Sequence, residues 1–337
     1  MTRVSGFEWK RPMDCTVMDH YRRSSRNGFT AHPIDRRHNL RKDAAWVSER
    51  LARPSTRFVP LWNSKNLLTC EDVPQPVFLT PGDIEDLGLT SDSVTFLGED
   101  DGNAYFAIEL PGDEPNLQQT LSLPCRLRDL RAVSALLDGK DASLLAYSRA
   151  IIYWHSRNRY CGNCGSPTMV SAAGHLRICS SGSCGLEHFP RTDPAIIVLV
   201  SAGEYCLLGR QAIWPEFMYS TLAGFVEPGE SLEDAVVREV WEETGIRVRE
   251  VHYHSSQPWP FPASIMLGFT AGAERGPVRL NDRELQDAGW FTREDIRMGI
   301  EKGSLKLPSV ISIAYHLIED WFGSAGLTPL RDVARRS

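Results

Sequence analysis

The sequence predicts a protein of the α+β and α/β classes, built from two domains with a small module between them. Three observations predict this organisation. Short β-like runs alternate with turns up to about residue 125 and lead into helical stretches, residues 158–190 are rich in Cys, Gly and Ser, and apolar strands from residue 194 open a further domain. A length of 337 residues suits such a chain. The predicted segments are an N-terminal extension, an N-terminal domain, a cysteine module, a C-terminal domain and a tail, at residues 1–28, 29–157, 158–190, 191–325 and 326–337.

Composition and charge exclude several classes of function. Lys and Arg number 37 against 43 Asp and Glu, so the net charge of −6 gives no basic field over the whole surface that would attract nucleic acid or a membrane. Two local basic runs, RRSSR at 22–26 and RRHNLRK at 36–42, are interpreted as a solvated surface or tail in preference to an RNA-binding site. No apolar run approaches the roughly 18 residues of a membrane helix, and the N-terminus lacks a hydrophobic signal region. We therefore expect a soluble, cytoplasmic protein.

The N-terminal half divides, in chain order, into a lead-in, a group of strands and two helices. Residues 1–28 are polar, basic and weakly patterned, so we expect a mobile lead-in. Strands follow, with LGEDDGN at 97–103 as a hairpin turn. Two helices are predicted at about 127–138 and 141–157, the second carrying the strongly apolar LLAYSRAIIYW. The predicted strands are RFVPLW, PVFLT, SVTFLG and NAYFAIEL.

The cysteine module has the spacing of a structural metal site. Cys161 and Cys164 form one pair, and after fourteen residues Cys179 and Cys184 form a second. Two close pairs of thiolates separated by a hairpin-length insert match tetrahedral zinc, and four cysteine ligands leave no open position for catalysis. The alternatives are four unrelated thiols, or one cysteine replaced as ligand by a histidine, either His175 or His188. The other cysteines lack such spacing and are taken as ordinary residues: Cys15, Cys70, Cys125 and Cys206.

The C-terminal domain is predicted to open with two buried strands, PAIIVLV at 194–200 and YCLLGR at 205–210. A helix then runs from Ser231 to Gly245, because Asp234 stands three residues after the serine as a reciprocal cap and glycine commonly ends helices. The buried stripe of this helix consists of Leu232, Ala235, Val236 and Val240. The domain is completed by strands at 248–256 and 264–272 and by helices near 292–300 and 309–322.

Three carboxylates share one face of this helix. Glu239, Glu242 and Glu243 fall at i, i+3 and i+4, where like charges repel one another. Mg²⁺ and Mn²⁺ prefer carboxylate oxygens, so the cluster predicts a divalent metal site. The simpler alternative is a solvated acidic helix face. Arg238 lies beside the cluster and is expected to hold the preceding loop through one of two acids, Glu230 or Glu227.

The window GFVEPGESLEDAVVREVWEETGI at 224–246 resembles the Nudix box of the Nudix hydrolases at every defining position. Those enzymes cleave a nucleoside diphosphate linked to another group, using divalent metal on the box glutamates. The resemblance implies an α/β/α sandwich with a mixed sheet, and Glu239, Glu242 and Glu243 as ligands of Mg²⁺ or Mn²⁺. It implies that Glu243, or failing that Glu242, accepts the proton of the attacking water. Arg238 is counted with the catalytic residues.

A second segment narrows the resemblance. SQPWPFPAS at 256–264 has three prolines in nine residues, which favours a rigid loop whose Trp259 and Phe261 offer flat faces to a heterocycle; a packing loop is the alternative. Within the Nudix family, this segment is similar to the signature of the NADH pyrophosphatases. The four-cysteine ribbon, FPRTDPAIIV at 189–198 and PIDRRHNLRKD at 33–43 are also similar to features of that subfamily. The resemblance covers about residues 29–325. It departs from the pattern in the wider second cysteine spacing, in Phe189 where a tyrosine is common, and in the N-terminal extension.

The resemblance implies metal-dependent hydrolysis of the pyrophosphate bond of NAD(H) to nicotinamide mononucleotide and AMP. It also implies structural zinc, a homodimer, and Glu284 as a further ligand of the catalytic metal. Substrate contacts are implied for Ala223 and Phe225 beside the box glycine, and for Phe189, which would stack on a base across a dimer interface. Further substrate contacts are implied at Gln257, Trp259, Ser264 and Ala314.

Two other functions are left open. Members of the subfamily also remove NAD caps from RNA 5′ ends, because the bond cleaved is the same. The acidic net charge argues against strong RNA affinity, although the two basic runs would supply local phosphate contacts. A non-catalytic zinc-ribbon nucleotide sensor would predict an eroded box, whereas its glutamates and arginine are all present. The expected partners are NAD(H) and related dinucleotides, with NAD-capped RNA as the alternative and no membrane.

Overall fold

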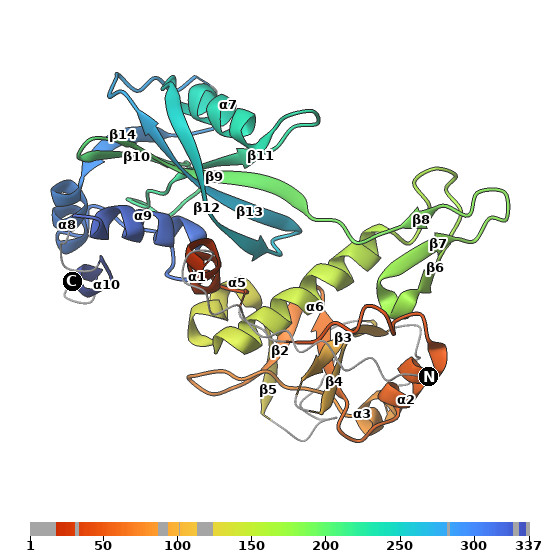
Figure 1. The fold of residues 1–337 in the computed structure, drawn as a ribbon. Coiled ribbons are helices and arrows are strands. Elements are labelled where there is room, and N and C mark those ends of the chain that lie inside the picture. The colour runs from red at the N-terminus through yellow and green to blue at the C-terminus, as the bar shows by residue number, and fades with distance from the viewer. Residues whose placement is uncertain are drawn as a thin grey trace.

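The computed structural model arranges the chain as two sandwich domains with a small ribbon beside them (Figure 1). Cys15, most of the predicted lead-in and part of the predicted tail lie outside the residues that the structure describes. Among the described residues, no helix has both the length and the apolar character needed to cross a lipid bilayer. The described residues are 18–30, 34–86, 94–100, 102–112, 124–281, 284–325 and 330–334.

A mixed sheet forms the centre of the C-terminal domain. Its strands are β9 (Asp193–Ala202), β10 (Tyr205–Arg210), β11 (Leu222–Phe225), β12 (Val248–Trp259), β13 (Ser264–Ala273) and β14 (Asp287–Thr292). The strand order is β12-β13-β9-β10-β14, with β11 paired to β9. β9 runs parallel to β13 and antiparallel to β10 and β11. The central strand is therefore paired along its length, as its continuous apolar sequence predicts.

Helices cover both faces of this sheet, which confirms the predicted α/β/α sandwich. Alternate residues of a strand point to opposite faces, so Val198 of β9 packs with α7 whereas Leu199 packs with α9. In Figure 1, α7 lies above the sheet and α9 below it. The helices of this domain are α7 (Leu232–Thr244), α8 (Arg293–Glu301), α9 (Ile313–Gly323) and α10 (Leu330–Ala334).

The N-terminal domain is built around a second mixed sheet. Its strands are β1 (Arg57–Trp62), β2 (Lys65–Thr69), β3 (Val94–Asp100), β4 (Asn103–Glu109) and β5 (Cys125–Asp129). They follow the order β3-β4-β1-β2-β5, with β1 parallel to β4. Val59 and Leu68 pack with α6 on one face, and Phe58 and Phe106 pack with α2 and α3 on the other. The helices are α2 (Ala44–Leu51), α3 (Pro81–Asp86), α5 (Leu130–Val133) and α6 (Gly139–Arg157).

Two N-terminal elements differ from the sequence prediction. The helix predicted at 127–138 is helical only from Leu130, because residues 125–129 form β5 and place Leu127 opposite Leu67 of β2. Pairing with a sheet edge here overrides local helix propensity. The predicted strand PVFLT makes single bridges to β1 and β2 and then gives way to α3.

The predicted lead-in contains a helix. α1 (Met18–Arg26) packs against β12, and Arg26 pairs with Glu319 and Asp320 of α9 at 2.5 and 2.6 Å. The side-chain amide of Asn27 then donates to Ser255 Oγ at 3.2 Å. Residues 18–28 therefore differ from the mobile segment that was expected, because tertiary ion pairs stabilise a helix whose own sequence is polar.

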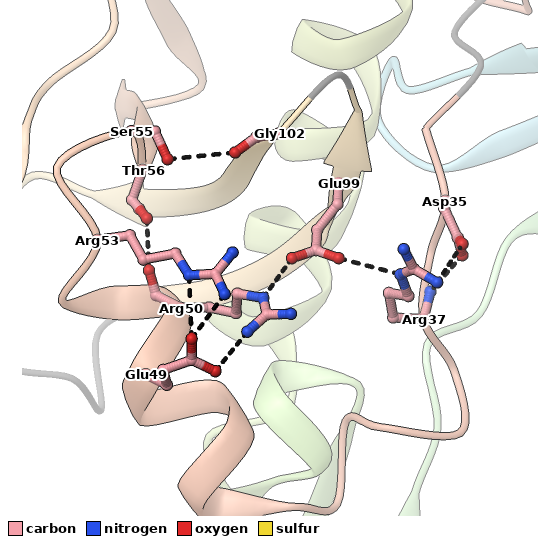
Figure 2. A network of polar contacts seen from close by, with 9 residues as sticks. All are labelled: Asp35, Arg37, Glu49, Arg50, Arg53, Ser55, Thr56, Glu99 and Gly102. Carbon is pink, nitrogen blue, oxygen red and sulfur yellow. Dashed lines mark hydrogen bonds and ion pairs between the residues drawn. The ribbon is translucent and has the colours of Figure 1, made fainter. Parts of the chain in front are cut away.

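An ion-pair network joins the segment after α1 to β3, at the edge of the N-terminal sheet (Figure 2). Asp35 and Glu99 of β3 exchange backbone hydrogen bonds of 2.9 Å in both directions. The carboxylate of Glu99 accepts from Arg37 at 3.0 Å and from Arg50 of α2, and Arg50 also pairs with Glu49 at 2.5 Å. Part of the basic run at 36–42 is thus used to hold this domain together.

The hairpin of β12 and β13 contacts the N-terminal domain at its tip. The ring of Phe29 lies 6.0 Å from that of Trp259 and 5.8 Å from that of Phe261. Arg149 of α6 donates to the Pro260 carbonyl at 2.9 Å. Figure 1 shows this tip pointing toward α6. The first half of the SQPWPFPAS segment is not a loop, because Gln257, Pro258 and Trp259 end β12; Pro258 is tolerated there because β12 is an edge strand.

Candidate active site and zinc site

The helix that carries the predicted metal ligands is fixed at both ends. Ser231 Oγ accepts the N–H of Asp234 at 3.1 Å, and the Asp234 carboxylate accepts the N–H of Ser231 at 3.3 Å, which is the predicted reciprocal cap. Gly245 ends the helix with a φ of 69° and donates to the Trp241 carbonyl at 2.8 Å. Val240 is fully buried between them, so α7 presents one defined face outward.

Arg238 joins the carboxylates of this face into one group. Its guanidinium donates to Glu230 at 2.5 and 2.9 Å, to Glu239 at 2.8 Å and to Glu242 at 2.9 Å. The hydrogen bond from Arg238 lowers the pKa of Glu230 to about 2. Of the two acids expected to hold the loop before the helix, Glu230 is the one whose side chain pairs with Arg238. Arg238 thereby fixes two of the three predicted metal ligands.

The box glycine makes room for one of these carboxylates. A methyl group added at Gly224 of β11 would lie 1.9 Å from the carboxyl carbon of Glu239 and 2.0 and 2.2 Å from its oxygens. Any side chain at position 224 would therefore displace the carboxylate of Glu239. Burial raises the pKa of Glu239, against the lowering effect of Arg238. A divalent cation at this point would compensate the carboxylate for its lost hydration.

An open cleft of about 980 Å³ lies beside α7 and β11, with the ends of β12 and β13 in its wall. Glu284 is distant from the box in sequence, yet it lines the same cleft as Glu239 and Glu242. Three carboxylates around one space form an all-oxygen donor set, which fits Mg²⁺ or Mn²⁺. The cleft also brings together most of the predicted substrate contacts, namely Ala223, Phe225, Trp259 and Ser264.

The two candidates for the proton acceptor have different surroundings. The side chain of Glu242 is 49% exposed, lines the cleft and shares Arg238. Glu243 is 2% exposed, although it lies one helical turn beyond Glu239 on the same face. The box therefore presents one open and one enclosed carboxylate.

Gln257, an implied substrate contact, does not line the cleft. It is fully buried, and its amide nitrogen donates to the carbonyls of Ile311 at 2.7 Å and Gly28 at 3.1 Å. Its amide oxygen accepts the Ile313 N–H at 2.9 Å. Both polar atoms are engaged by the main chain, so Gln257 joins the segment after α1, the start of α9 and the edge strand β12.

Two further predicted contacts also lie away from the cleft. Ala314 is 2% exposed and belongs to the core beneath α9, and its implied role as a ligand contact stays a prediction. Phe189 is 56% exposed at the end of the ribbon and does not line the cleft of its own chain.

The cleft has lining residues that sequence reasoning missed. Trp241 occupies a variable box position three residues after Arg238, so helical spacing was an available signal for it. Asn281 had no such signal, because its place depends on a tertiary hydrogen bond of 3.1 Å from its amide to the Trp241 carbonyl. Other lining residues missed from sequence are Gln211 after β10, Ala195 of β9 and Met266 of β13.

The four predicted zinc ligands converge in the ribbon. The ribbon strands are β6 (Thr168–Ser171), β7 (Leu176–Cys179) and β8 (Glu187–His188). The sulfurs of Cys161, Cys164, Cys179 and Cys184 all lie within 4.8 Å of one another. Cys161 and Cys184 are 3.9 Å apart at Sγ, and Cys164 and Cys179 are 3.4 Å apart. Tetrahedral zinc with Zn–S bonds of about 2.3 Å requires sulfurs roughly 3.8 Å apart, so the donor set fits.

The histidine alternatives have less support. The imidazole of His175 is bonded through Nε2 to the Phe96 carbonyl at 2.7 Å and so faces the N-terminal domain. The wider spacing of the second cysteine pair is accommodated by a turn in which Gly185 adopts a φ of 58°. Among the described residues, the four cysteines are the one group of His, Cys, Asp and Glu side chains found close enough together to hold a metal ion without rearrangement.

Comparison with protein families agrees with this arrangement. The NUDIX domain matches residues 190–309, the NADH pyrophosphatase-like rudimentary NUDIX domain matches residues 55–154, and the NADH pyrophosphatase zinc ribbon domain matches residues 156–189. The NAD-capped RNA hydrolase NUDT12 of Macaca fascicularis is 34% identical over 88% of this chain and 73% of its own length, and the human protein of that name is 33% identical with the same coverage. The NAD-capped RNA hydrolase NudC of Mycobacterium bovis is 43% identical over 59% of this chain and 66% of its own length.

These matches define the class of protein. The chain belongs to the Nudix hydrolase family, in the zinc-ribbon group of NADH pyrophosphatases and NAD-capped RNA hydrolases.

Proposed function

We propose that this protein hydrolyses the pyrophosphate bond of NAD(H) and releases nicotinamide mononucleotide and AMP. The observation that carries the proposal is the cleft itself, where Glu239, Glu242 and Glu284 face the same space as Trp259 and Phe225. Acidic metal ligands and aromatic faces in one cleft suit a substrate that has a charged centre and flat heterocyclic ends. Relatives of this chain are named NAD-capped RNA hydrolases, which supports a substrate that contains NAD.

The reaction adds water across one phosphoanhydride bond. The oxygen of water bonds to one phosphorus, the bond from that phosphorus to the bridging oxygen breaks, and the bridging oxygen leaves with the other phosphate. Bound Mg²⁺ or Mn²⁺ would neutralise charge on the phosphate oxygens. Glu243 accepts the proton of the attacking water, with Glu242 as the alternative. Arg238 acts as a positioning residue, because Glu230 and the two cleft glutamates already occupy its guanidinium.

Substrate recognition is assigned to the walls of the cleft. Trp259 supplies an aromatic face at the hairpin tip, and Phe225, 59% exposed, supplies another beside the metal site. Ser264 offers a hydroxyl at the base of the same tip. The proposal also includes a homodimer in the cytoplasm, in which Phe189 of one copy reaches the cleft of the other; the exposure of Phe189 supports this part.

Removal of NAD caps from RNA is the second candidate, and it is supported by relatives at 34% and 43% identity that are named NAD-capped RNA hydrolases. A purely sensory role has no such support, because the box keeps its glutamates and its arginine in paired geometry. The test is turnover of NADH, NAD⁺, ADP-ribose and NAD-capped RNA side by side, with Mg²⁺ and with Mn²⁺. Release of nicotinamide mononucleotide is the expected result, and absence of turnover of both dinucleotides with either metal would reject the proposal.

A further inference from the structure

A second groove, of about 760 Å³, adjoins the catalytic cleft at the C-terminal end of α7. The start of β12 and the segment that follows β13 form its other walls. Its charged lining is four arginines against the single carboxylate of Glu274, on a chain whose net charge is −6. A concentrated positive groove on an acidic protein attracts phosphate groups selectively to that place. The four arginines are Arg247, Arg249, Arg275 and Arg279.

These arginines are all exposed, and one of the four is held in an ion pair. Arg249 pairs with Glu274 at 3.0 Å, and within the part of the chain that the structure describes no carboxylate forms an ion pair with the other three. Positive charge at the end of α7 would complement the helix dipole, which accounts for Arg247 and Arg279. It does not account for Arg275, whose guanidinium lies 3.9 Å from the centre of the Tyr205 ring.

The two basic runs seen in the sequence are differently placed. In the first, Arg26 is paired with Glu319 and Asp320 of α9. In the second, Arg37 is paired with Glu99 (Figure 2), and Arg36 lies 4.2 Å from the centre of the Tyr147 ring. Carboxylates thus neutralise Arg26 and Arg37, whereas three of the four groove arginines form no ion pair with a described carboxylate.

Groove and cleft are continuous. Trp241 and Asn281 line both of them. Trp241 is 45% exposed, and the guanidinium of Arg247 lies 5.2 Å from its ring centre. An exposed indole flanked by a cation is a surface on which a nucleic-acid base stacks while its phosphate is neutralised.

We propose that this groove binds the first nucleotides of a single-stranded RNA whose 5′ end carries the dinucleotide cleaved in the adjoining cleft. The inference rests on the proposed function for the identity of that dinucleotide. In such a substrate, the RNA continues from the adenosine ribose, so the adenosine half faces Trp241 and the groove.

The nicotinamide half then faces the other end of the site. Trp259 pairs with Ser264 at one end of the β12–β13 hairpin, and Val248 pairs with Ala273 at the other end. At a rise of about 3.3 Å per residue, the two ends lie about 30 Å apart. The basic groove begins at this second end. Dinucleotide recognition and RNA binding therefore occupy opposite ends of one hairpin.

The test compares two double variants with the parent protein. Arg247→Ala with Arg279→Ala removes two charges from the groove, and Arg22→Ala with Lys42→Ala removes two from the basic runs, at exposed positions. The substrates are free NAD⁺ and a short NAD-capped single-stranded RNA. A 5′-monophosphate RNA of the same sequence serves as a binding probe that requires no catalysis, and its fluorescence anisotropy is followed at several salt concentrations.

The groove variant is expected to lose roughly 25-fold in RNA affinity at 0.1 M salt. Each phosphate contact to a single strand contributes about 0.7 to the slope of log affinity against log salt concentration, and the variant removes two such contacts. The same variant should lose a similar factor in kcat/KM on capped RNA and keep that on free NAD⁺, and the control variant should match the parent. Equal RNA affinity in the groove variant and the parent, or a larger loss in the control variant, would overturn the inference. If the parent protein turns over neither substrate but the groove variant still binds the RNA probe more weakly than the parent, the proposed reaction is rejected. The RNA groove remains supported in that case.

Discussion

The carboxylate of Glu239 occupies the space into which a side chain at Gly224 would project. We predict that Gly224→Ala moves this carboxylate and lowers kcat by roughly 10²-fold, the cost of about 1 Å of misplacement at a reacting centre. Thermal stability should change little, because the end of a flexible side chain can move away from the new methyl group. Gly289→Ala is the matched control, since its added carbon would make an ordinary contact of 3.7 Å with Phe291. Activity of Gly224→Ala within a few-fold of that control would contradict the placement of Glu239 as a metal ligand.

Glu243→Gln is expected to abolish turnover and preserve the fold. The change is nearly isosteric, so packing around this enclosed residue should survive, while the proton acceptor is lost. A loss of at least ~10²-fold in kcat is the size expected for a general base. Glu242→Gln, at the open position, should retain more activity if Glu243 is the base. Kinetics and thermal melts of both variants decide the assignment, and near-parental kcat for a folded Glu243→Gln would transfer the role to Glu242.

Cys164→Ser should release one zinc ion per chain and lower the melting temperature, because structural zinc contributes directly to folding. Cys70→Ser, at a half-buried position outside the ribbon, is the control and should keep its zinc. Elemental analysis and thermal melts measure both effects. Zinc-free parent protein, purified without chelator, would end the idea of a structural zinc site.

Trp259→Ala should affect NAD(H) more than ADP-ribose. Loss of a stacking face of about 1–3 kcal/mol corresponds to a fall in NAD(H) efficiency of roughly 5- to 150-fold, whereas ADP-ribose lacks the nicotinamide ring. Phe29→Ala controls for packing, because Phe29 touches Trp259 and is buried. Both substrates are assayed on each preparation. Equal losses on the two would show that Trp259 only supports the hairpin tip.

Gln257→Ala is expected to lower stability and leave the KM for NAD⁺ unchanged. The variant leaves the buried carbonyls of Gly28 and Ile311 and the Ile313 N–H without their amide partner, and each such loss costs about 1–3 kcal/mol. Chemical denaturation and steady-state kinetics give the two quantities. A raised KM with unchanged unfolding free energy would restore the ligand contact that sequence resemblance implied.

The parts of the site that were predicted from sequence are those built by local rules. The cap at Ser231, the stop at Gly245 and the carboxylate spacing lie within one helix, and the cysteine pairs lie within one ribbon. The parts that were missed depend on distant segments. Gln257 lies in a motif that suggests a ligand, but its partners come from residues 28, 311 and 313.

The same distinction explains the errors in secondary structure. β5 forms because β2 offers it an edge, and α1 is held by acids of α9, nearly three hundred residues further along the chain. The basic groove is assembled from the end of α7, the start of β12 and the segment after β13, so no single run of arginines in the sequence predicts it. Local sequence pattern therefore predicts the metal-binding carboxylates and cysteines, whereas the elements around them depend on tertiary contacts.

The tip of the β12–β13 hairpin contacts both the cleft and the N-terminal domain, so it can couple the two domains. Trp259 faces the cleft on one side and Phe29 on the other, and Arg149 of α6 bonds to the neighbouring Pro260. A ligand that stacks on Trp259 must therefore also favour the docked arrangement of the N-terminal domain. Linkage is reciprocal, so any factor by which docking strengthens ligand binding is also the factor by which the ligand strengthens docking. The N-terminal domain, which lies away from the predicted metal ligands, can therefore influence the affinity of the cleft for its ligand.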